Sequence, residues 1–251
     1  MNKLGVFFTC FDEYEASRFS LNTLKNVYPD INISLFYEGD INFKTLESEI
    51  SNLKCIKEPD TMSGYLNITN GNHLSDKDQK SIKTAAVAVI KRIFKSIPHL
   101  DSEYILMMDP DAIVRGKLSI PEGVGLLGCR MNKHVAAIQE LNNTLERYGG
   151  KKITAWGATP AIVNLKKFKI GADILLNTPN LIEDLCKSFY WFCAHDILLA
   201  CIFSLIGEEE TFNPELLQCS SVHNWRQYNH PLIHQFRDYY PPRKSKYKVN
   251  E

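Results

Sequence analysis

Residues 104–108 read YILMM, an unbroken apolar run, and two aspartates, Asp109 and Asp111, follow it directly. Side chains of a strand alternate between its two faces, so a run that is apolar at every position suits a strand covered on both faces. Such strands are typical of parallel sheets with helices on each side. The run therefore predicts a central strand of an α/β protein, and the two charges at its end need a reason.

The residues before this run alternate between strand and helix patterns. Apolar runs at 3–10 and 31–38 predict buried strands, and residues 13–29 carry apolar side chains at helical spacing. Residues 43–54 predict a second helix, and a brief strand follows at 55–58. A chain that alternates in this way predicts a parallel sheet with crossover helices.

The remaining segments continue the mixed pattern without an internal repeat or a linker, which predicts a single domain. The expected elements are a long polar loop at 59–80, a helix at 75–97 ending before Pro98, a strand at 123–130, a helix at 134–150, two strand pieces within 152–168 broken at Gly157, a largely helical segment at 180–207 with a break near 190–194, and an irregular C-terminal part. The basic end, 241–251, is expected to be a solvated tail, with a membrane or phosphate contact as the alternative.

Composition restricts the class of partner and the compartment. The chain has 251 residues, and its 29 basic side chains balance 29 acidic ones, so no electrostatic footprint for nucleic acid is present. The N-terminal apolar run is too short for a signal peptide, and the run at 197–207 is well below the ~20 residues of a membrane span. Seven cysteines without a CxxC pair favour a reducing compartment. We therefore expect a soluble cytoplasmic protein with no nucleic-acid partner and no transmembrane segment.

The aspartate pair is the main functional candidate. Ligands of open parallel sheets bind outside the carboxyl ends of the strands, which is where Asp109 and Asp111 are expected. In an extended chain the two side chains would point the same way and converge on one cation. Oxygen ligands suit Mg²⁺ or Mn²⁺, and such an ion would neutralise a departing diphosphate. The alternative is an Asp-Pro-Asp turn with solvated carboxylates.

The segment SEYILMMDPDAIVRG, residues 102–116, resembles the DxD segment of nucleotide-sugar-dependent glycosyltransferases with the GT-A fold. Three further segments follow in the order of that superfamily. ITAWGATPAIVNLKKF (153–168) is similar to the small-residue strand that lines the donor sugar, CAHDILLACIFSLIG (193–207) resembles the acidic helix start, and PLIHQFRDYYPP (231–242) resembles the late histidine loop. The resemblance implies a single GT-A domain with a Rossmann-like, mostly parallel sheet flanked by helices. It also implies a nucleotide-binding half at about 1–115 and a sugar and acceptor half at about 116–240.

The resemblance also implies roles for particular residues. The metal ligands would be Asp109, Asp111 and His234, holding Mn²⁺ or Mg²⁺, with His223 and His230 as alternatives to His234. Asp109 could instead hold the ribose or a metal-bound water. The donor nucleotide and sugar would be bound by Thr9, Cys10, Phe11, Lys83, Asp109, Gly157, Ala158 and Arg237, with Arg92 as an alternative to Lys83. The sugar pocket would be shaped by Trp156, Gly157, Ala158 and Thr159.

Asp196 is the catalytic candidate of the acidic helix start. It would act as a general base on the acceptor hydroxyl or stabilise an oxocarbenium-like centre, and the alternative is a simple helix N-cap. The sequence departs from the family pattern at Trp156, where asparagine is usual, and at Ala194-His195, which replaces Asp-Gln of the retaining branch. These departures leave open the donor identity and whether the anomeric configuration is retained. Two tryptophans, Trp191 and Trp225, would form an acceptor platform or belong to the core.

The resemblance predicts transfer of a sugar from a nucleoside-diphosphate sugar, with UDP favoured, to a hydroxyl of a glycan or glycoconjugate. One alternative is a Mg²⁺-dependent phosphohydrolase of the haloacid dehalogenase type, which also uses DxD. That family carries its motif near the N-terminus with Thr or Val two residues on, where this chain has Ile113 at mid-chain. The other alternative is a non-catalytic module that binds a nucleotide sugar.

Overall fold

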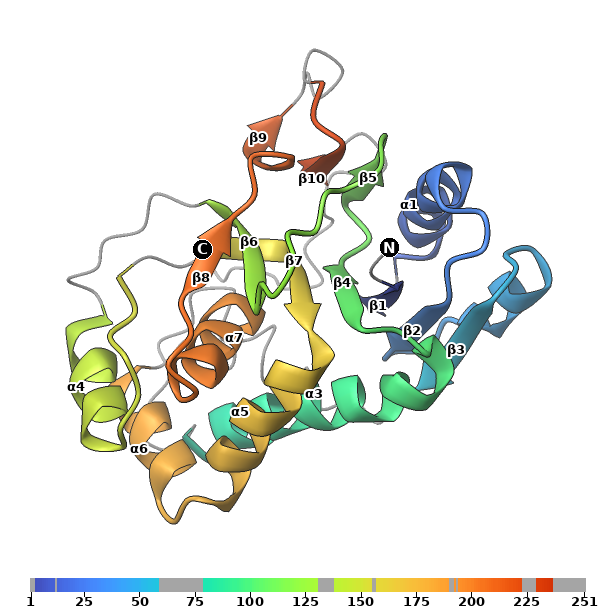
Figure 1. Ribbon diagram of the computed structural model, residues 1–251. Helices are drawn as coiled ribbons and strands as arrows, with labels where there is room; N and C mark the ends of the chain where they lie inside the picture. Colours follow the sequence, from blue (N-terminus) through green and yellow to red (C-terminus); the bar gives the residue numbers. More distant parts are fainter. Residues whose placement is uncertain are drawn as a thin grey trace, which may run out of the picture.

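The computed structural model describes residues 3–11, 13–58, 79–130, 138–154, 157–189, 192, 194–222 and 229–236. The centre of the molecule is a seven-stranded sheet in the order β3-β2-β1-β4-β7-β6-β8 (Figure 1). Its strands are β1 Leu4–Cys10, β2 Ile33–Tyr37, β3 Leu53–Lys57, β4 Tyr104–Met108, β6 Leu126–Arg130, β7 Gly157–Asn164 and β8 Glu210–Phe212.

The sheet is mostly parallel, as the alternation of strands and helices predicted. Strands β3, β2, β1 and β4 run parallel to their neighbours, and β6 runs parallel to β8. Only β7 is reversed among the described strands, and it pairs antiparallel with both β4 and β6. The predicted central position of β4 is confirmed, because all five of its residues are buried.

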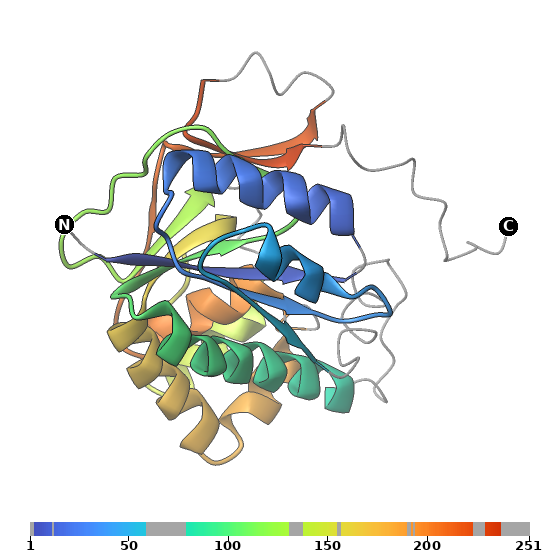
Figure 2. The same ribbon diagram turned by 90° about the vertical axis from the view of Figure 1, so that its right-hand side faces the viewer.

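Helices cover both faces of this sheet (Figure 2). They are α1 Tyr14–Val27, the 3-10 helix η1 Phe43–Ser48, α3 Gln79–Leu100, α4 Gln139–Arg147, α5 Leu165–Asn177, α6 Leu181–Ser188 and α7 His195–Ser204. Alternate strand residues divide the core into two clusters. Phe7, Ile105 and Met107 pack with α3 to α7, whereas Phe8 and Leu106 pack with α1 and η1. This two-sided burial is the reason the central strands are apolar at every position.

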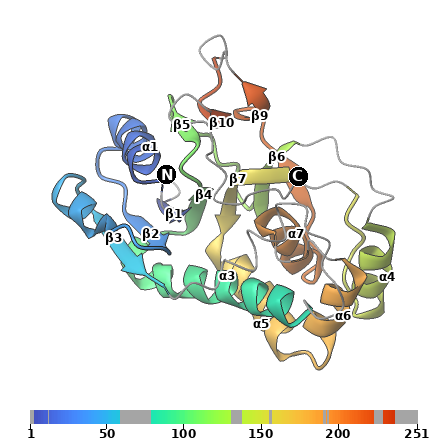
Figure 3. The same cartoon turned by 180° about the vertical axis from the view of Figure 1, so that it is seen from behind.

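A second, three-stranded sheet lies beside α1 (Figure 3). It has the order β5-β10-β9, formed by β5 Ala112–Val114, β10 Leu232–Phe236 and β9 Leu216–Val222. Strand β10 pairs antiparallel with β5 and parallel with β9. The backbone N–H of Val114 donates to Thr23 Oγ1 of α1 at 3.1 Å, which attaches the small sheet to the main body.

Several predicted elements differ from the structure. The helix expected at 43–54 is only the six-residue 3-10 helix η1, because Asn42 caps its start and the chain reverses at Asn52, which has a φ of 58°. The two strand pieces expected within 152–168 are the single strand β7 followed at once by α5. Asn164 causes this change, because its side chain accepts a hydrogen bond from Lys167 N and caps the new helix.

Two further expectations need correction. The helix expected to end before Pro98 continues through it to Leu100, since only the last turn follows the proline. The C-terminal part expected to be irregular contains β8, β9 and β10. The expected break near 190–194 is confirmed, because α6 ends at Ser188 and α7 begins at His195. Most of the predicted loop at 59–80 and the whole tail at 241–251 lie outside the described residues.

Candidate functional site

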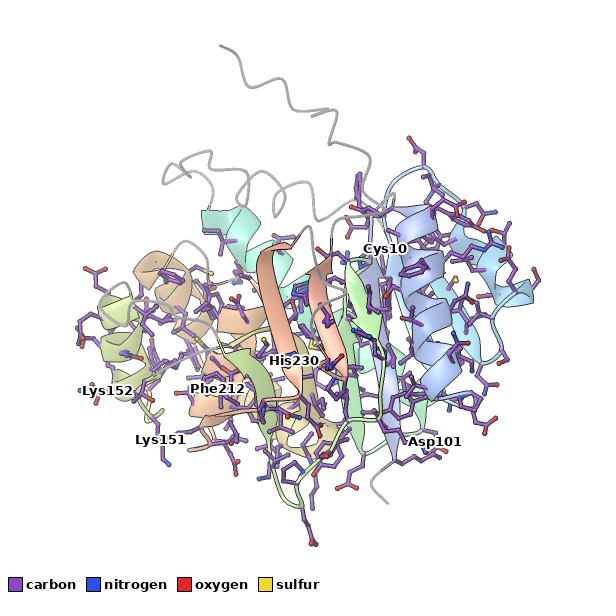
Figure 4. The ribbon with its side chains drawn as sticks, turned by 90° about the horizontal axis from the view of Figure 1, so that it is seen from above. Cys10, Asp101, Lys151, Lys152, Phe212 and His230 are labelled. Carbon is purple, nitrogen blue, oxygen red and sulfur yellow. The ribbon has the colours of Figure 1, made fainter. Side chains whose placement is uncertain are left out.

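The candidate site lies at the carboxyl ends of β1 and β4. These two strands are neighbours, but the chain continues from β1 to β2 on one side and reaches β4 on the other side. Such a topological switch point is where open α/β sheets bind their ligands. In Figure 4, Cys10 marks this end of the sheet and Asp101 marks the opposite end.

Asp109 and Asp111 are brought together by a tight turn. The backbone N–H of Ala112 donates to the carbonyl oxygen of Asp109 at 3.1 Å, and Pro110 lies inside the turn, where its fixed φ is favourable. The expected extended geometry is therefore wrong, and the turn that was its alternative is correct for the backbone. The two carboxylates nevertheless belong to one site, because both lie close to His234 of β10.

His234 completes the site from the far end of the chain. Its strand β10 pairs with β5 so that His234 lies opposite Ala112, immediately after Asp111. The Nε2 atom of His234 is 3.0 Å from Asp111 Oδ1 and 3.6 Å from Asp109 Oδ2. One ligand atom from each of the three residues lies within 4.8 Å of the others, a spacing that one cation can occupy.

The charges of the three residues depend on one another. Burial lowers the pKa of His234, but the hydrogen bonds and charges of Asp109 and Asp111 outweigh burial and raise that pKa to about 9. Burial raises the pKa of Asp109, yet His234, His195 and Thr9 together hold it below its usual value. Without a cation, His234 is therefore protonated at neutral pH and lies against the side chains of Asp109 and Asp111.

The donor set suits Mn²⁺ or Mg²⁺. Two carboxylates and an imidazole match the hard to intermediate ligands that these ions accept. A divalent ion would replace the proton of His234, and it would leave one positive charge more at the site. The structure thus brings the three predicted metal ligands together, while His223 lies outside the described residues and His230 precedes β10.

The predicted acidic helix start is the N-terminus of α7, and it lies close to Asp109. Helix α7 begins at His195, and its N-cap is Ala194, so the alternative in which Asp196 is the N-cap is wrong. Asp196 lies in the first turn, is partly exposed, and its Oδ1 accepts from the N–H of Ile197 at 3.0 Å. His195 is buried, and burial lowers its pKa although the charge of Asp109 acts to raise it. His195 is therefore a neutral group close enough to Asp109 to feel its charge.

The predicted donor-binding residues lie in different surroundings. Cys10 and Phe11 are half-buried at the end of β1, and burial raises the pKa of the Cys10 thiol well above its usual range. The Phe11 ring lies against Gly39, where an added Cβ would be 3.6 Å from the ring. Lys83 forms an ion pair with Glu183 of α6, and both side chains are half exposed. The role of each in donor binding stays a prediction.

Gly157 and Ala158 begin β7, where they pair with Arg130 and Cys129 of β6. Their strand starts beside the carboxyl end of β4, since the two strands are antiparallel. Arg237 lies outside the described residues, and so do the two tryptophans expected to form an acceptor platform.

Two features of the site were not expected from the sequence. Thr159 donates a hydrogen bond to Asp109, and Glu38 forms a buried ion pair with Arg92 of α3, with side chains 2% and 4% exposed. The sequence carried a signal for Glu38, because this charged residue directly follows the apolar strand β2, as Asp109 directly follows β4. Thr159 was expected to shape the sugar pocket, but its hydrogen bond to Asp109 had no signal in the sequence, because it depends on the pairing of β7 with β4.

No helix in the described part of the chain is long and apolar enough to span a membrane.

Comparison with known proteins supports the fold. No protein-family model matches the sequence, and no curated protein matches it either. Among solved structures, the chain is similar to a galactosyltransferase, LgtC, in complex with donor and acceptor sugar analogs. That match has a TM-score of 0.53 and 16% identity, and it covers 92% of this chain and 86% of the other. Mouse xyloside xylosyltransferase 1 in its apo form aligns over 92% of this chain and 96% of its own, with a TM-score of 0.48 and 12% identity. With its seven-stranded, mostly parallel sheet, the chain has the fold of GT-A glycosyltransferases.

Proposed function

We propose that the protein is a metal-dependent glycosyltransferase. It would transfer a hexosyl or pentosyl group from a nucleoside-diphosphate sugar, with UDP as the favoured nucleotide, to a hydroxyl of a glycan or glycoconjugate. The observation that carries the proposal is the cluster of Asp109, Asp111 and His234 at the switch point of a GT-A sheet. The GT-A likeness supports the reaction class through the fold alone, and the site residues support the chemistry.

The three clustered residues would hold Mn²⁺ or Mg²⁺ beside the donor diphosphate. A bound divalent ion supplies positive charge that stabilises the diphosphate as it departs. Asp109 and Asp111 would hold the ion from the end of β4, and His234 would hold it from β10. The cluster is partly buried, so its electrostatic interactions are stronger than they would be in water.

Asp196 is the proposed catalytic carboxylate. It would take the proton of the acceptor hydroxyl, or it would stabilise positive charge on the sugar. Thr9, Cys10 and Phe11 would contact the nucleoside, Gly157 and Ala158 the sugar, and Lys83 and Arg237 the phosphates.

The compartment is proposed from the cysteines. The five that the structure describes in full, Cys10, Cys55, Cys129, Cys186 and Cys201, are free thiols. Free, mostly buried thiols favour a reducing compartment, which supports a cytoplasmic location.

The decisive experiment compares the wild-type protein with Asp111→Ala. Release of nucleotide from UDP-, GDP- and dTDP-sugars is measured with Mn²⁺ and with a chelator, and Asp173→Ala on the exposed face of α5 is the matched control. We expect turnover of one donor with Mn²⁺, loss of that turnover in Asp111→Ala, and no change in the control. Unchanged turnover in Asp111→Ala would contradict the proposed metal site.

The two other functions give different results in the same assay. Phosphate release from simple phosphomonoesters, without any nucleotide, would indicate a phosphohydrolase. Tight UDP binding with neither transfer nor slow donor hydrolysis would indicate a binding module.

A further inference from the structure

Asp109 is held by two threonines, one on each side of it. Thr9 Oγ1 donates to Asp109 Oδ1 at 3.0 Å, and Thr159 Oγ1 donates to Asp109 Oδ2 at 3.1 Å. Each oxygen of the carboxylate thus accepts one hydroxyl hydrogen bond. The two threonines are 150 residues apart in sequence, so the tertiary fold and not local sequence brings them to the same carboxylate.

Strand register explains why the three residues meet. Strand β4 lies between β1 and β7, and the pairs Phe8↔Met108 and Met107↔Ala161 fix the two registers. Continued past the strand ends, these registers place Thr9 and Thr159 opposite Asp109. Residues that lie opposite one another point to the same face of a sheet, so all three side chains share one face.

The same face carries the helices α3 to α7. Phe7, Met107 and Ala161, each two residues from one of the three side chains, belong to the core cluster of those helices. The helical layer and the two neighbouring strands therefore restrict Asp109 on three sides. A carboxylate with hydrogen bonds to both oxygens cannot rotate freely about its Cβ–Cγ bond without losing both.

We propose that Thr9 and Thr159 are positioning residues that fix the plane of the Asp109 carboxylate for a divalent cation. This inference rests on the metal site of the proposed function and adds the groups that orient one of its ligands. Thr9 is thereby assigned a role toward the carboxylate in addition to the proposed nucleoside contact. Hydrogen-bond partners behind a ligand usually change metal affinity by about 10- to 100-fold when they are removed.

A fixed carboxylate also favours some ions over others. Mg²⁺ demands near-ideal octahedral geometry, whereas Ca²⁺ accepts six to eight oxygen ligands in flexible arrangements. Removal of the threonine hydroxyls should therefore weaken the binding of Mg²⁺ and Mn²⁺ more than that of Ca²⁺. A change in the stability of the fold alone would not alter the ratio of the Mg²⁺ or Mn²⁺ affinity to the Ca²⁺ affinity.

The test measures the binding of Mn²⁺, Mg²⁺ and Ca²⁺ to the full chain directly. Titration calorimetry gives each dissociation constant, with no nucleotide present. Thr9→Val and Thr159→Val remove each hydroxyl at nearly constant size, and Thr9→Ser and Thr159→Ser retain it. Thr211→Val is the matched control, since Thr211 is exposed on the edge strand β8. Far-ultraviolet circular dichroism and thermal unfolding establish that each variant is folded.

We expect each valine variant to bind Mn²⁺ about 10- to 100-fold more weakly, with a smaller loss for Ca²⁺. The serine variants should recover most of the affinity, and Thr211→Val should match the wild type. Wild-type affinity in both valine variants would overturn the inference and leave the proposed function intact. Equal losses in the valine and serine variants would overturn it as well. Absence of metal binding to the wild type would overturn the metal site itself. The two valine variants are independent, so failure of one to fold leaves the other as the test.

Discussion

His234 is a cation in the metal-free protein because two carboxylates surround it. Its Nε2 lies 3.0 Å from Asp111 and 3.6 Å from Asp109, and these partners raise its pKa from 6.5 to about 9. An imidazole must lose its extra proton to bind a metal, so a divalent cation and a proton compete for the Nε2 atom of His234. The free energy of metal binding is therefore less favourable by the free energy needed to remove that proton.

This competition predicts that metal affinity depends on pH. Below its pKa, His234 is protonated and must release one proton when metal binds, so the affinity should rise about tenfold per pH unit. The rise should continue through neutral pH and level off as the pH passes the pKa of His234, which is about 9. Calorimetric titration with Mg²⁺ in buffers of different ionisation enthalpy measures both the affinity and the proton released.

The raised pKa of His234 also makes the free energy of unfolding of the metal-free protein depend on pH. Because the pKa of His234 is raised from 6.5 to about 9 in the folded state, its contribution to the stability of the metal-free fold is complete only below about pH 6.5 and declines above that pH. That stabilisation is lost as the pH rises through about 9. The variant His234→Asn should lose the pH dependence of metal binding along with much of the affinity. Equal affinities at the two ends of the pH range in the wild type would contradict the competition.

Among the secondary-structure elements, α5 and α7 make an unusually close contact. A Cβ placed on Gly171 of α5 would lie 2.3 Å from the carbonyl oxygen of Ile202 and 2.8 Å from its Cγ2. The nearest atom belongs to the backbone of α7, which cannot rotate away. Gly171 is therefore required by packing, although glycine is a poor residue for the interior of a helix.

Gly171→Ala tests this contact, because two effects of the substitution oppose each other. Alanine favours the helix by about 1 kcal/mol, whereas overpacking a core costs about 1–3 kcal/mol. A backbone clash places the cost at the upper end, so the free energy of unfolding should fall by about 1–2 kcal/mol in urea denaturation. Lys169→Ala, at an exposed position of the same helix, should change it little. A Gly171→Ala protein as stable as the wild type would show that the two helices can separate without cost.

The elements that could be predicted are those with an unbroken pattern of their own. Strands β1, β2 and β4 and helix α1 follow from apolar runs and helical spacing within single segments. Strands β9 and β10 were missed because the residues LLQCSSV and LIHQF show no regular alternation, and their structure depends on pairing with each other and with β5. Helix α5 was missed because the apolar run of β7 continues into it, and only the Asn164 cap separates the two.

The candidate site was predictable to the extent that its residues stand at recognisable positions. Asp109 and Asp111 follow a buried strand, and His234 falls in a segment that resembles the late loop of the family. The turn geometry was not predicted, because Asp-Pro-Asp after a strand is compatible with both an extended chain and a turn. Thr159 was expected to shape the sugar pocket, but its contact with Asp109 could not be predicted, because an antiparallel strand in a mostly parallel sheet cannot be placed from its own sequence.

At the scale of the molecule, the proposed nucleotide-binding half and sugar half share both sheets. The expected boundary between the two halves, at residue 115, directly follows β5. Across this boundary, β4 pairs with β7 and β5 pairs with β10. The proposed metal ligands also come from both halves, with Asp109 and Asp111 on one side and His234 on the other. Binding of metal should therefore stabilise the whole folded unit and not one half.

This coupling predicts a thermal shift. A ligand present at about 100 times its dissociation constant stabilises a fold by about 2.7 kcal/mol, which corresponds to a Tm increase of about 5–10 °C for a domain of this size. We expect that increase with Mn²⁺ and UDP together, measured by differential scanning fluorimetry, and its reversal by a chelator. His234→Asn should not show the metal-dependent part. An equal shift in that variant would show that His234 does not contribute to binding.

The antiparallel pairing of β10 with β5 also has a consequence for synthesis of the chain. Asp109 and Asp111 leave the ribosome long before His234, and β5 must wait for β10 before the small sheet can form. A chain released early would carry the aspartate pair without its third partner. Retention of a divalent ion would then distinguish finished molecules from truncated ones, and purification on that basis would select protein whose C-terminal strand has reached its place.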